Sequence, residues 1–588
     1  MSEPLPPPAP MRRWRLRLLP AACALVALLM AANASGDVQP WVPEEKRSAQ
    51  TEGAMAVTAN PHATRAAHEL LAAGGSAVDA AIAAQLVLTL VEPQSSGIGG
   101  GAFLLHHDAG TGETLAYDGR ETAPAAADAG LFLQDGEPMD FREAVSGGLA
   151  VGVPGVVRLF EQAHARHGAR PWAELFQPAI ELAREGFEVS PRLNDILQRE
   201  WAILDNEAAR AYFHTDEGEP LPVGQRLRNP ALADTLSRIA EAGAEAFYTG
   251  PIAEAIVDAV QGAAHNPGRL TLEDMAGYRA EVREPVCAPY AGHRVCSAPP
   301  PAGGFVVLQI LGLLERAEAV HPPEDEADRA HLLAEASRLA YADRARFAAD
   351  PDHEPVPVAD LLDADYLDER AALIDPVRSM GEAEAGLALE PEQAAMPRRP
   401  ARPSTSHLSI VDAQGNAVSM TSSVEMPFGS GLFVRGFILN NQLTDFAFEP
   451  EDGNGDPVAN RVAPGKRPMS AMSPTLAFED DALRLAVGSP GGPWIIGYTA
   501  RHLALVLGEG APLAEAVAAP NWNNRNGPTK LEAVEGSEAL AGALRERGHE
   551  VSVRGMTSGV HAIFVDGDGV RHGAADPRRE GTALGVAP

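Results

Sequence analysis

Ser404-Thr405-Ser406-His407-Leu408-Ser409-Ile410-Val411-Asp412 is the stretch of this 588-residue chain that decides its fold. It follows residues 396–403, in which three prolines favour an extended backbone and three arginines favour exposure to water. From Thr405 the pattern changes to that of a β-hairpin, with an apolar run, a Gln-Gly-Asn turn at 414–416 and a second run at 417–420. We therefore predict an exposed linker that leads directly into a core hairpin.

The hydroxyl residue at this junction suggests a chemical role. Cleavage of the Ser404–Thr405 bond would give Thr405 both a nucleophilic hydroxyl and a free α-amine. An α-amine has an ordinary pKa of about 7.7–8, so near neutral pH it can act as the base for its own hydroxyl. A Ser or Thr before a strand is more often only a turn residue, so the junction alone does not establish a nucleophile.

Six further segments, rich in glycine, proline and polar residues, accompany the junction. In chain order they are EPQSSGIGGG (92–101), DGRETAP (118–124), NNQLTDF (440–446), PGKRPMSAMSPT (464–475), GSPGG (488–492) and GAADPRR (573–579). Together with the junction they resemble the γ-glutamyltransferase (glutathione hydrolase) family, in the family's order, from about Ala56 to the C-terminus. The resemblance implies a four-layer αββα sandwich of the N-terminal-nucleophile hydrolase type.

Residue patterns alone predict a layered α/β (α+β) fold, without giving the number of layers. The part before residue 400 is mostly helical by pattern, and the part after 405 is richer in strands. The helices expected from caps and apolar periodicity cover residues 64–73, 76–91, 172–185, 230–242, 252–260, 326–347, 495–507 and 537–547.

The resemblance also implies an enzyme of two chains made from one precursor. Cleavage between Ser404 and Thr405 would give a large subunit, residues 35–404, and a small subunit, residues 405–588. Thr405 would attack the γ-carbonyl of glutathione or another γ-glutamyl compound, forming an acyl-enzyme. Water, an amino acid or a peptide would then accept the acyl group. No cofactor and no metal ion is expected.

Three positions that match the family would assist the nucleophile. The backbone N–H groups of Gly491 and Gly492 would stabilise the negative oxygen of each tetrahedral intermediate. Ser423 would hydrogen-bond to the nucleophilic hydroxyl. Without the resemblance, the two glycines indicate a strand-to-helix turn, and Ser423 is an ordinary strand serine.

Four further matching positions would bind the substrate. Arg120 and Ser470 would bind the α-carboxylate, because a guanidinium can form two parallel hydrogen bonds to a carboxylate. Asp445 and Gln442 would bind the α-ammonium. Without the resemblance, Arg120 indicates a surface ion pair with Glu121 or Asp118.

Two positions depart from the family pattern. Glu425 stands where familiar members have asparagine, and Ala471 replaces the second of two serines that bind the carboxylate. These changes leave the acyl-transfer residues intact but make the ammonium pocket more anionic. They keep open a same-fold amidase or acylase, acting for example on β-lactam side chains. A non-enzymatic solute-binding protein is a third alternative.

The net charge of the chain bears on its partners, and its N-terminal segment bears on its location. The formal net charge of −33 disfavours a nucleic-acid partner, because an acidic surface repels phosphates. A basic segment at 11–17, an apolar run at 18–32 and the Ala32-Asn33-Ala34 site predict a signal peptide over residues 1–34 and an exported, periplasmic or secreted protein. A retained anchor is the less favoured alternative, because the apolar run is short and contains Pro20.

Two cysteines lie close together in the sequence, and two other segments match known binding motifs only in part. Cys287 and Cys296 flank a turn at 289–293, so they could face each other across two strands, as a disulfide or as free thiols. Residues 97–102 fit a loose dinucleotide pattern but precede a strand instead of a helix. Residues 452–456 imitate a calcium loop without its required glycine and glutamate.

Overall fold

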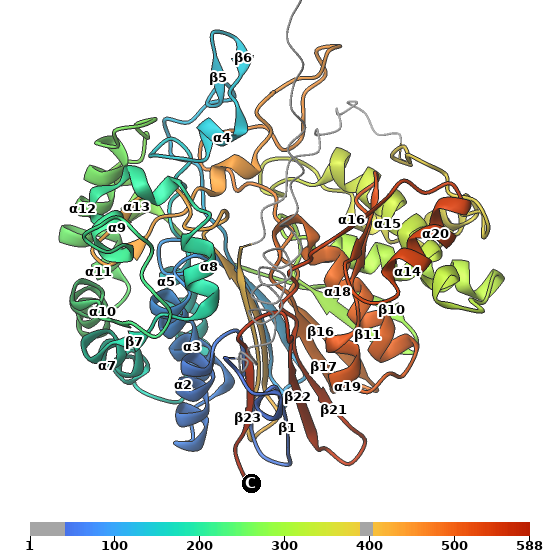
Figure 1. Ribbon diagram of the computed structural model, residues 1–588, viewed down its shortest axis with the longest axis horizontal. Helices are drawn as coiled ribbons and strands as arrows, with labels where there is room; N and C mark the ends of the chain where they lie inside the picture. Colours follow the sequence, from blue (N-terminus) through green and yellow to red (C-terminus); the bar gives the residue numbers. More distant parts are fainter. Residues whose placement is uncertain (1–40, 388–403) are drawn as a thin grey trace, which may run out of the picture.

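The computed structural model of the protein describes residues 41–387 and 404–588 (Figure 1). The expected signal peptide, residues 1–34, and the expected linker, residues 396–403, lie outside the described residues. Two sheets stand at the centre, with helices on both outer sides.

The hairpin predicted from the sequence is confirmed. Strands β12 (Ser406–Val411) and β13 (Ala417–Ser423) pair antiparallel, with Leu408 opposite Met420. They lie in the middle of a seven-stranded antiparallel sheet, where β12 also pairs with β2 (Met55–Thr58) and β13 with β3 (Gly101–His107). Beyond these, β23 (Thr582–Gly585) pairs with β2 at one end of the sheet. At the other end β4 (Thr114–Gly119) pairs with β3, and β9 (Glu281–Arg283) pairs with β4.

A second seven-stranded antiparallel sheet packs against the first. In spatial order it contains β1 (Ser48–Thr51), β22 (Arg571–Ala575), β21 (His561–Val565), β17 (Ala482–Gly488), β16 (Thr475–Glu479), β11 (His293–Ser297) and β10 (Val286–Tyr290). Both sheets thus combine strands from before and after residue 404. A chain cut at that point would stay together through its shared sheets.

The alternation of side chains along β12 shows how the layers are joined. Leu408 and Ile410 face the helices that cover the first sheet, and Val411 belongs to the core between the two sheets. The second sheet contributes Leu476 and Ile563 to the same core. Successive strand residues point to opposite faces, and both faces of β12 are buried, so the strand is buried along its whole length.

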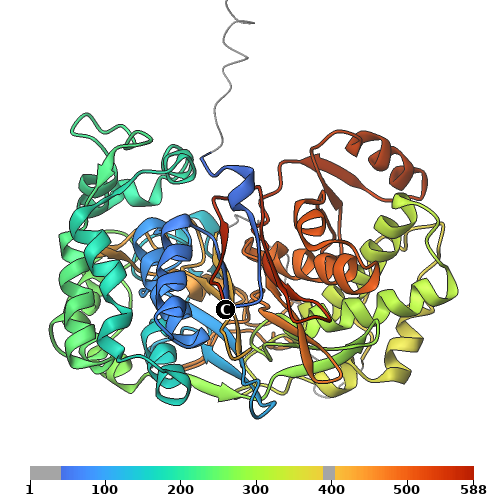
Figure 2. The same ribbon diagram turned by 90° about the horizontal axis from the view of Figure 1, so that it is seen from below.

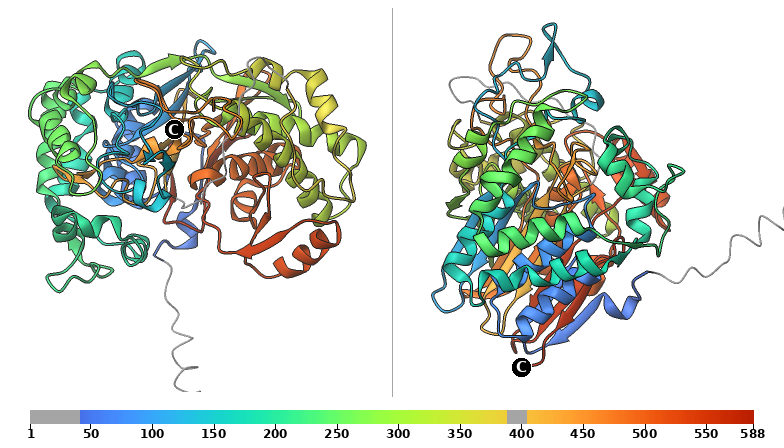
Figure 3. Two further views of the ribbon diagram at one scale, coloured as in Figure 1. Left: turned by 90° about the horizontal axis from the view of Figure 1, so that it is seen from above. Right: turned by 90° about the vertical axis from the view of Figure 1, so that its left-hand side faces the viewer.

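Helices cover the outer face of each sheet, which completes four layers (Figures 2 and 3). The first sheet carries α2 (Pro61–Ala72), α3 (Ala77–Val91), α5 (Val156–His167), α7 (Gln177–Glu185), α10 (Pro230–Ala242) and α12 (Gly250–Gln261). The second carries α14 (Gly304–Val320), α15 (Glu326–Phe347), α18 (Ile495–Leu503), α19 (Leu513–Ala518) and α20 (Ser537–Glu546). Within the described ranges, no helix has both the length and the apolar character needed to cross a membrane.

Shorter elements connect these layers. The helices are α4 (Phe141–Ala144), α6 (Trp172–Leu175), α8 (Pro191–Leu197), α9 (Glu207–Phe213), α11 (Glu245–Tyr248), α13 (Leu272–Gly277), α16 (Val358–Leu361) and α17 (Ala364–Ala371). The short strands are β5 (Leu133–Gln134), β6 (Glu137–Pro138), β7 (Phe187–Glu188), β8 (Arg226–Leu227), β14 (Phe433–Val434), β15 (Phe437–Ile438), β18 (Trp522–Asn523), β19 (Thr529–Glu532) and β20 (Val551–Arg554).

Most predicted helices are confirmed, and one is wrong in detail. The helices expected at 230–242 and 326–347 have those bounds, because Asn229 and Asp325 cap their first turns with side-chain hydrogen bonds. The single helix expected at 172–185 is two helices, α6 and α7. Pro178 stands at the start of α7 and has no N–H with which to continue α6.

The two cysteines lie opposite each other in the β10–β11 hairpin. Cys287 pairs in register with Cys296, and their sulfur atoms are bonded at 2.06 Å. Of the two alternatives left by the sequence, the structure therefore has the disulfide. It joins the last two strands of the second sheet.

Candidate active site

Thr405 is held at the point where the chain enters β12. Its side chain is buried, and its N–H donates to the carbonyl of Ser95 at 3.1 Å. Its Oγ1 lies 3.0 Å from Oγ of Ser423, the last residue of β13. Oγ of Ser423 accepts the N–H of Glu425 at 2.9 Å, so its own hydrogen is free to point at Thr405. The hairpin thereby places a second hydroxyl within hydrogen-bond distance of the predicted nucleophile.

The peptide bond before Thr405 has an acceptor and a donor already in contact. The carbonyl oxygen of Ser404 accepts the N–H of Gly491 at 3.2 Å, and Oγ of Ser404 donates to the carbonyl of Gln94 at 2.6 Å. Gly491 must be glycine, because its φ is +138° and a Cβ would lie 2.7 Å from the ring of Tyr498. This N–H is therefore placed to stabilise negative charge on the Ser404 oxygen.

Gly492 and the backbone of Thr405 complete this part of the site. Gly492 begins the short helix η4 (Gly492–Trp494), so of the predicted glycine pair it is Gly491 that contacts the Ser404 carbonyl in the uncut chain. Thr405 has a φ of +84°, a left-handed conformation that a β-branched residue adopts rarely. Such strain costs on the order of 1–3 kcal/mol and would be released when the Ser404–Thr405 bond breaks.

Arg120 is buried and meets Asp445. Its Nε and Nη2 donate to the carbonyls of Pro468 and Met469 at 3.1 and 2.9 Å, and Nη2 also lies 2.6 Å from Oδ2 of Asp445. The surface ion pair that Arg120 would otherwise indicate is excluded, because only 1% of its side chain is exposed, against 36% for Asp445. A ligand with adjacent carboxylate and ammonium groups could separate this pair and bind one residue with each charge.

Gln442 and Ser470 lie close to this ion pair in the chain. Gln442 shares the short helix η3 (Gln442–Asp445) with Asp445, and both of its side-chain amide atoms are buried with no hydrogen-bond partner in the described chain. Such groups are costly unless a ligand or water satisfies them. Oγ of Ser470 accepts the N–H of Met472 at 3.1 Å, which leaves its hydrogen to donate.

Glu121 is a site residue to which the sequence analysis gave no role in binding. Burial raises its pKa to about 8, against the opposing effect of Arg120, whose Nη1 lies 3.7 Å from Oε2 of Glu121. Neither carboxyl oxygen has a hydrogen-bond partner in the described part of the chain. In the sequence, the only indication that Glu121 belongs to the site is its position next to Arg120. The fold then shows that both side chains are buried.

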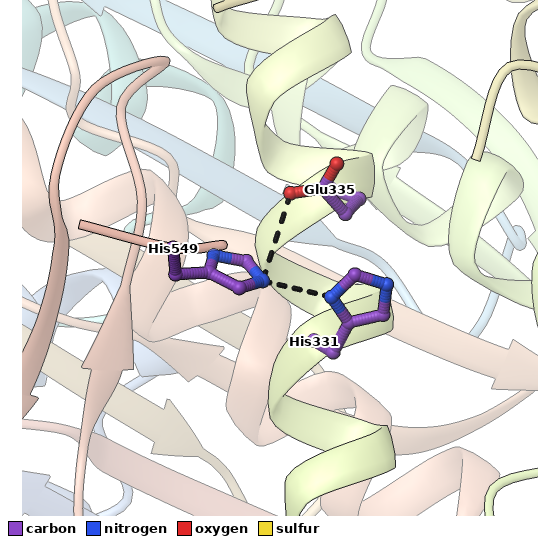
Figure 4. Close-up of side chains that lie close together, drawn as sticks. All are labelled: His331, Glu335 and His549. Carbon is purple, nitrogen blue, oxygen red and sulfur yellow. Dashed lines mark hydrogen bonds and ion pairs between the residues drawn. The ribbon is translucent and has the colours of Figure 1, made fainter. Parts of the chain in front are cut away.

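A second cluster of polar residues shares no residue with this site (Figure 4). His331, Glu335 and His549 offer possible ligand atoms within 4.8 Å of one another. Nε2 of His331 donates to the carbonyl of Asp375 at 2.7 Å, and Nδ1 of His331 shares a hydrogen bond with Nε2 of His549 at 2.7 Å. The guanidinium of Arg338 already pairs with Glu335 at 2.8 Å. These contacts use all three side chains, and we assign the cluster a structural role.

Comparison with known proteins establishes the family. A family model described as gamma-glutamyltranspeptidase matches residues 63–586. The chain is 35% identical to the glutathione hydrolase proenzyme of Bacillus subtilis (strain 168), over 96% of this chain and 98% of that protein. It is 36% identical to the glutathione hydrolase proenzyme of Escherichia coli (strain K12), over 94% and 97%. The chain therefore belongs to the gamma-glutamyltranspeptidase family.

Acylases are among its relatives as well. The chain is 36% identical to the acylase ACY 1 proenzyme of Pseudomonas sp. (strain SE83), over 92% of this chain and 95% of that protein. The solved structure of a cephalosporin acylase from Bacillus halodurans matches with a TM-score of 0.81 and 28% identity, over 94% and 99%. The solved structure of the Helicobacter pylori gamma-glutamyltranspeptidase matches with a TM-score of 0.52 and 33% identity, over 55% of this chain and 91% of that chain. The predicted N-terminal-nucleophile hydrolase fold is thus confirmed.

Replacing Arg120 by lysine tests its predicted role as the carboxylate clamp. Arg120→Lys keeps the charge but loses the planar fork, and a hydrogen bond to a charged group is worth about 1.5–3 kcal/mol. We expect KM for a γ-glutamyl anilide to rise about ten- to a hundredfold. Arg158→Lys should leave KM unchanged, because Arg158 lies on α5 and pairs with Glu161 and Glu245. An unchanged KM in Arg120→Lys would show that Arg120 only supports the fold.

Titration of Glu121 should weaken substrate binding at alkaline pH. Below a pKa of about 8 the group is neutral, and above it a carboxylate competes with the substrate for Arg120. We expect KM to rise roughly two- to tenfold between pH 7 and 9.5 in the wild type and to stay flatter in Glu121→Gln. Titration of the substrate amine affects both proteins, so the ratio of their KM values isolates Glu121. A pH-independent ratio would contradict this role.

Proposed function

We propose that the chain is a precursor that cuts itself between Ser404 and Thr405 and then transfers γ-glutamyl groups through an ester on Thr405. The observation that carries this proposal is a pair of contacts at one peptide bond. Gly491 donates to the carbonyl that would be attacked, and Ser423 lies against the hydroxyl that would attack it. Family membership supports an enzyme, so the solute-binding alternative is not pursued.

Self-cleavage would proceed in two steps. Oγ1 of Thr405 attacks the Ser404 carbonyl carbon, the C–N bond breaks, and the proton lost from Oγ1 ends on the nitrogen of Thr405. Water then hydrolyses the resulting ester, leaving a carboxylate on Ser404 and a free amine and hydroxyl on Thr405. The N–H of Gly491 stabilises the oxyanion in both steps. Residues 35–404 and 405–588 would become the two subunits.

Turnover would use the same groups on a bound amide. The α-amine of Thr405 takes the proton of Oγ1 as this oxygen attacks the γ-carbonyl, and it returns the proton to the leaving amine. Water or an amino group then attacks the acyl-enzyme and restores the hydroxyl. Arg120 with Ser470 would bind the α-carboxylate, and Asp445 with Gln442 the α-ammonium.

We further propose that residues 1–34 direct export of the chain and are then removed. The sequence pattern of that segment supports export, and an oxidising compartment suits the bond between Cys287 and Cys296. Glutathione and other γ-glutamyl compounds outside the cytoplasm would be the substrates.

The acylase alternative has a specific basis in Glu425 and Ala471, together with the acylases among the relatives. Acylases act on amides whose acyl group need not carry an α-ammonium. The γ-glutamyltransferase and acylase hypotheses therefore differ in how much binding of an α-ammonium group contributes to turnover. Glu425 lies two residues after Ser423, donates its N–H to Oγ of Ser423 at 2.9 Å, and has a φ of +80°.

Cleavage before Thr405 is the first test of the proposal. The purified wild type should give two fragments on a denaturing gel, and N-terminal sequencing of the smaller one should begin at Thr405. Thr405→Ala should remain one chain with no γ-glutamyl anilide turnover, because it has no hydroxyl. Ser409→Ala, which removes another buried hydroxyl of β12, should still be cut. A fragment that begins at any other residue would refute the mechanism.

The ratio of kcat/KM for a γ-glutamyl anilide to kcat/KM for a glutaryl anilide tests the substrate class. γ-Glutamyl and glutaryl anilides share the carboxylate and differ only in the α-ammonium. A charged hydrogen bond worth about 1.5–3 kcal/mol predicts a ten- to hundredfold higher kcat/KM for the γ-glutamyl anilide. Glu425→Asn should narrow this ratio.

Ala471→Ser is the matched control, because it adds a donor for the carboxylate that both substrates carry. Ala471→Ser should raise kcat/KM for both anilides and leave the ratio of the two kcat/KM values unchanged. A wild type that cuts the glutaryl anilide faster would favour the acylase reading.

A further inference from the structure

Arg579 belongs to the segment 573–579, to which neither the predicted site nor the proposed mechanism gives a role. Its side chain is buried, and Nη1 donates to the carbonyl oxygen of Thr405 at 2.9 Å. Nε donates to the carbonyl of Ser558 at 3.1 Å. Within the described ranges no carboxylate oxygen lies within 4.0 Å of it, whereas its neighbour Arg578 pairs with Glu532 at 2.6 Å. A buried cation without a close counter-ion is costly and marks a functional candidate.

The surroundings of Arg579 are shaped to hold it there. The carboxylate of Asp576 accepts hydrogen bonds from the side chain of Ser558 and from the N–H groups of Val560 and Arg578, which fixes the turn before Arg579. Gly559 lies under the side chain, and a Cβ there would be 2.6 Å from Cδ of Arg579. The position of the guanidinium is therefore set by the turn on one side and by a glycine on the other.

The other charged groups around Arg579 are largely engaged elsewhere. Glu92 accepts the hydroxyl of Ser406 at 2.8 Å and lies 3.9 Å from Nε of Arg192. Asp576 pairs with Arg578 at 3.0 Å. The phenol of Tyr498 is neutral at physiological pH, because burial raises its pKa. Burial lowers the pKa of Arg579 to about 9, which still leaves it charged at neutral pH.

We propose that Arg579 is the positioning residue of the mature nucleophile, and that its charge keeps the α-amine of Thr405 in the free-base form. This inference rests on the proposed function, because the amine exists only after cleavage. Three covalent bonds separate the α-nitrogen from the carbonyl oxygen that Arg579 holds. A like charge within about 4–6 Å disfavours the protonated amine, so its pKa falls below the ordinary 7.7–8. The amine can then accept the hydroxyl proton near neutral pH.

The test uses full-length precursors with Arg579→Gln, Arg579→Lys and, as a matched control, Arg571→Gln. Arg571, the first residue of β22, is another buried arginine that donates to a backbone carbonyl, that of Asp412. The extent of cleavage is read from a gel, and kcat/KM for a γ-glutamyl anilide is measured from pH 5.5 to 9.5. Loss of the charge in Arg579→Gln should move the acid limb to higher pH. Relative to its own plateau, this variant should retain about tenfold less activity at pH 6.5 than the wild type.

The remaining variants separate charge from structure. Arg579→Lys and Arg571→Gln should keep the acid limb of the wild type, even if their plateaus fall. A limb that does not move in cleaved Arg579→Gln overturns the inference, and so does an equal shift in Arg579→Lys. If Arg579→Gln is not cleaved, the test rests on Arg579→Lys, which the inference expects to be cleaved and to keep the acid limb of the wild type. If neither variant is cleaved, the inference is also overturned. Failure of the proposed function is distinct, since the wild type would then not begin its small fragment at Thr405.

Discussion

Insertion of β12 between β2 and β13 is the constraint on which the rest of the structure depends. The strand is buried on both faces, and Thr405, the residue before it, is buried and donates its N–H to the carbonyl of Ser95. The same burial explains how a cut next to Thr405 is compatible with a folded protein. Both sheets take strands from each side of residue 404, and breaking one peptide bond leaves the hydrogen-bonded ladders intact.

From this fixed point the site is built by pairs of groups that already contact each other. Ser423 faces Thr405 because the hairpin register brings the end of β13 beside the start of β12. Gly491 reaches the Ser404 carbonyl because β17 of the other sheet ends nearby. Arg120 and Asp445 form an ion pair at 2.6 Å, and under the proposed function a ligand with both charges would replace this contact. In the proposed mechanism the groups around the Ser404 carbonyl therefore need little reorganisation, and such preorganisation is the main source of electrostatic catalysis.

Local signals predicted much of the fold and part of the site. The hairpin after Thr405 and the capped helices at 230–242 and 326–347 follow from alternation and capping, which act over a few residues. The break at Pro178 was also a local signal, and the prediction of one helix over it was wrong. The resemblance supplied the four layers and the site residues, whose roles stay predictions. Glu121 and Arg579 could not be assigned, because their burial and their partners depend on contacts between distant segments.

The central claim is that Thr405 carries the acyl group, and trapping this intermediate tests it most directly. The cleaved enzyme is mixed with a γ-glutamyl anilide, quenched in acid within the first turnovers, and analysed by intact-mass and peptide mass spectrometry. The account predicts that the fragment 405–588 gains the mass of one γ-glutamyl group, located on its N-terminal threonine. An acyl group on any other residue, or turnover with no acylated fragment in a burst-phase sample, would contradict it.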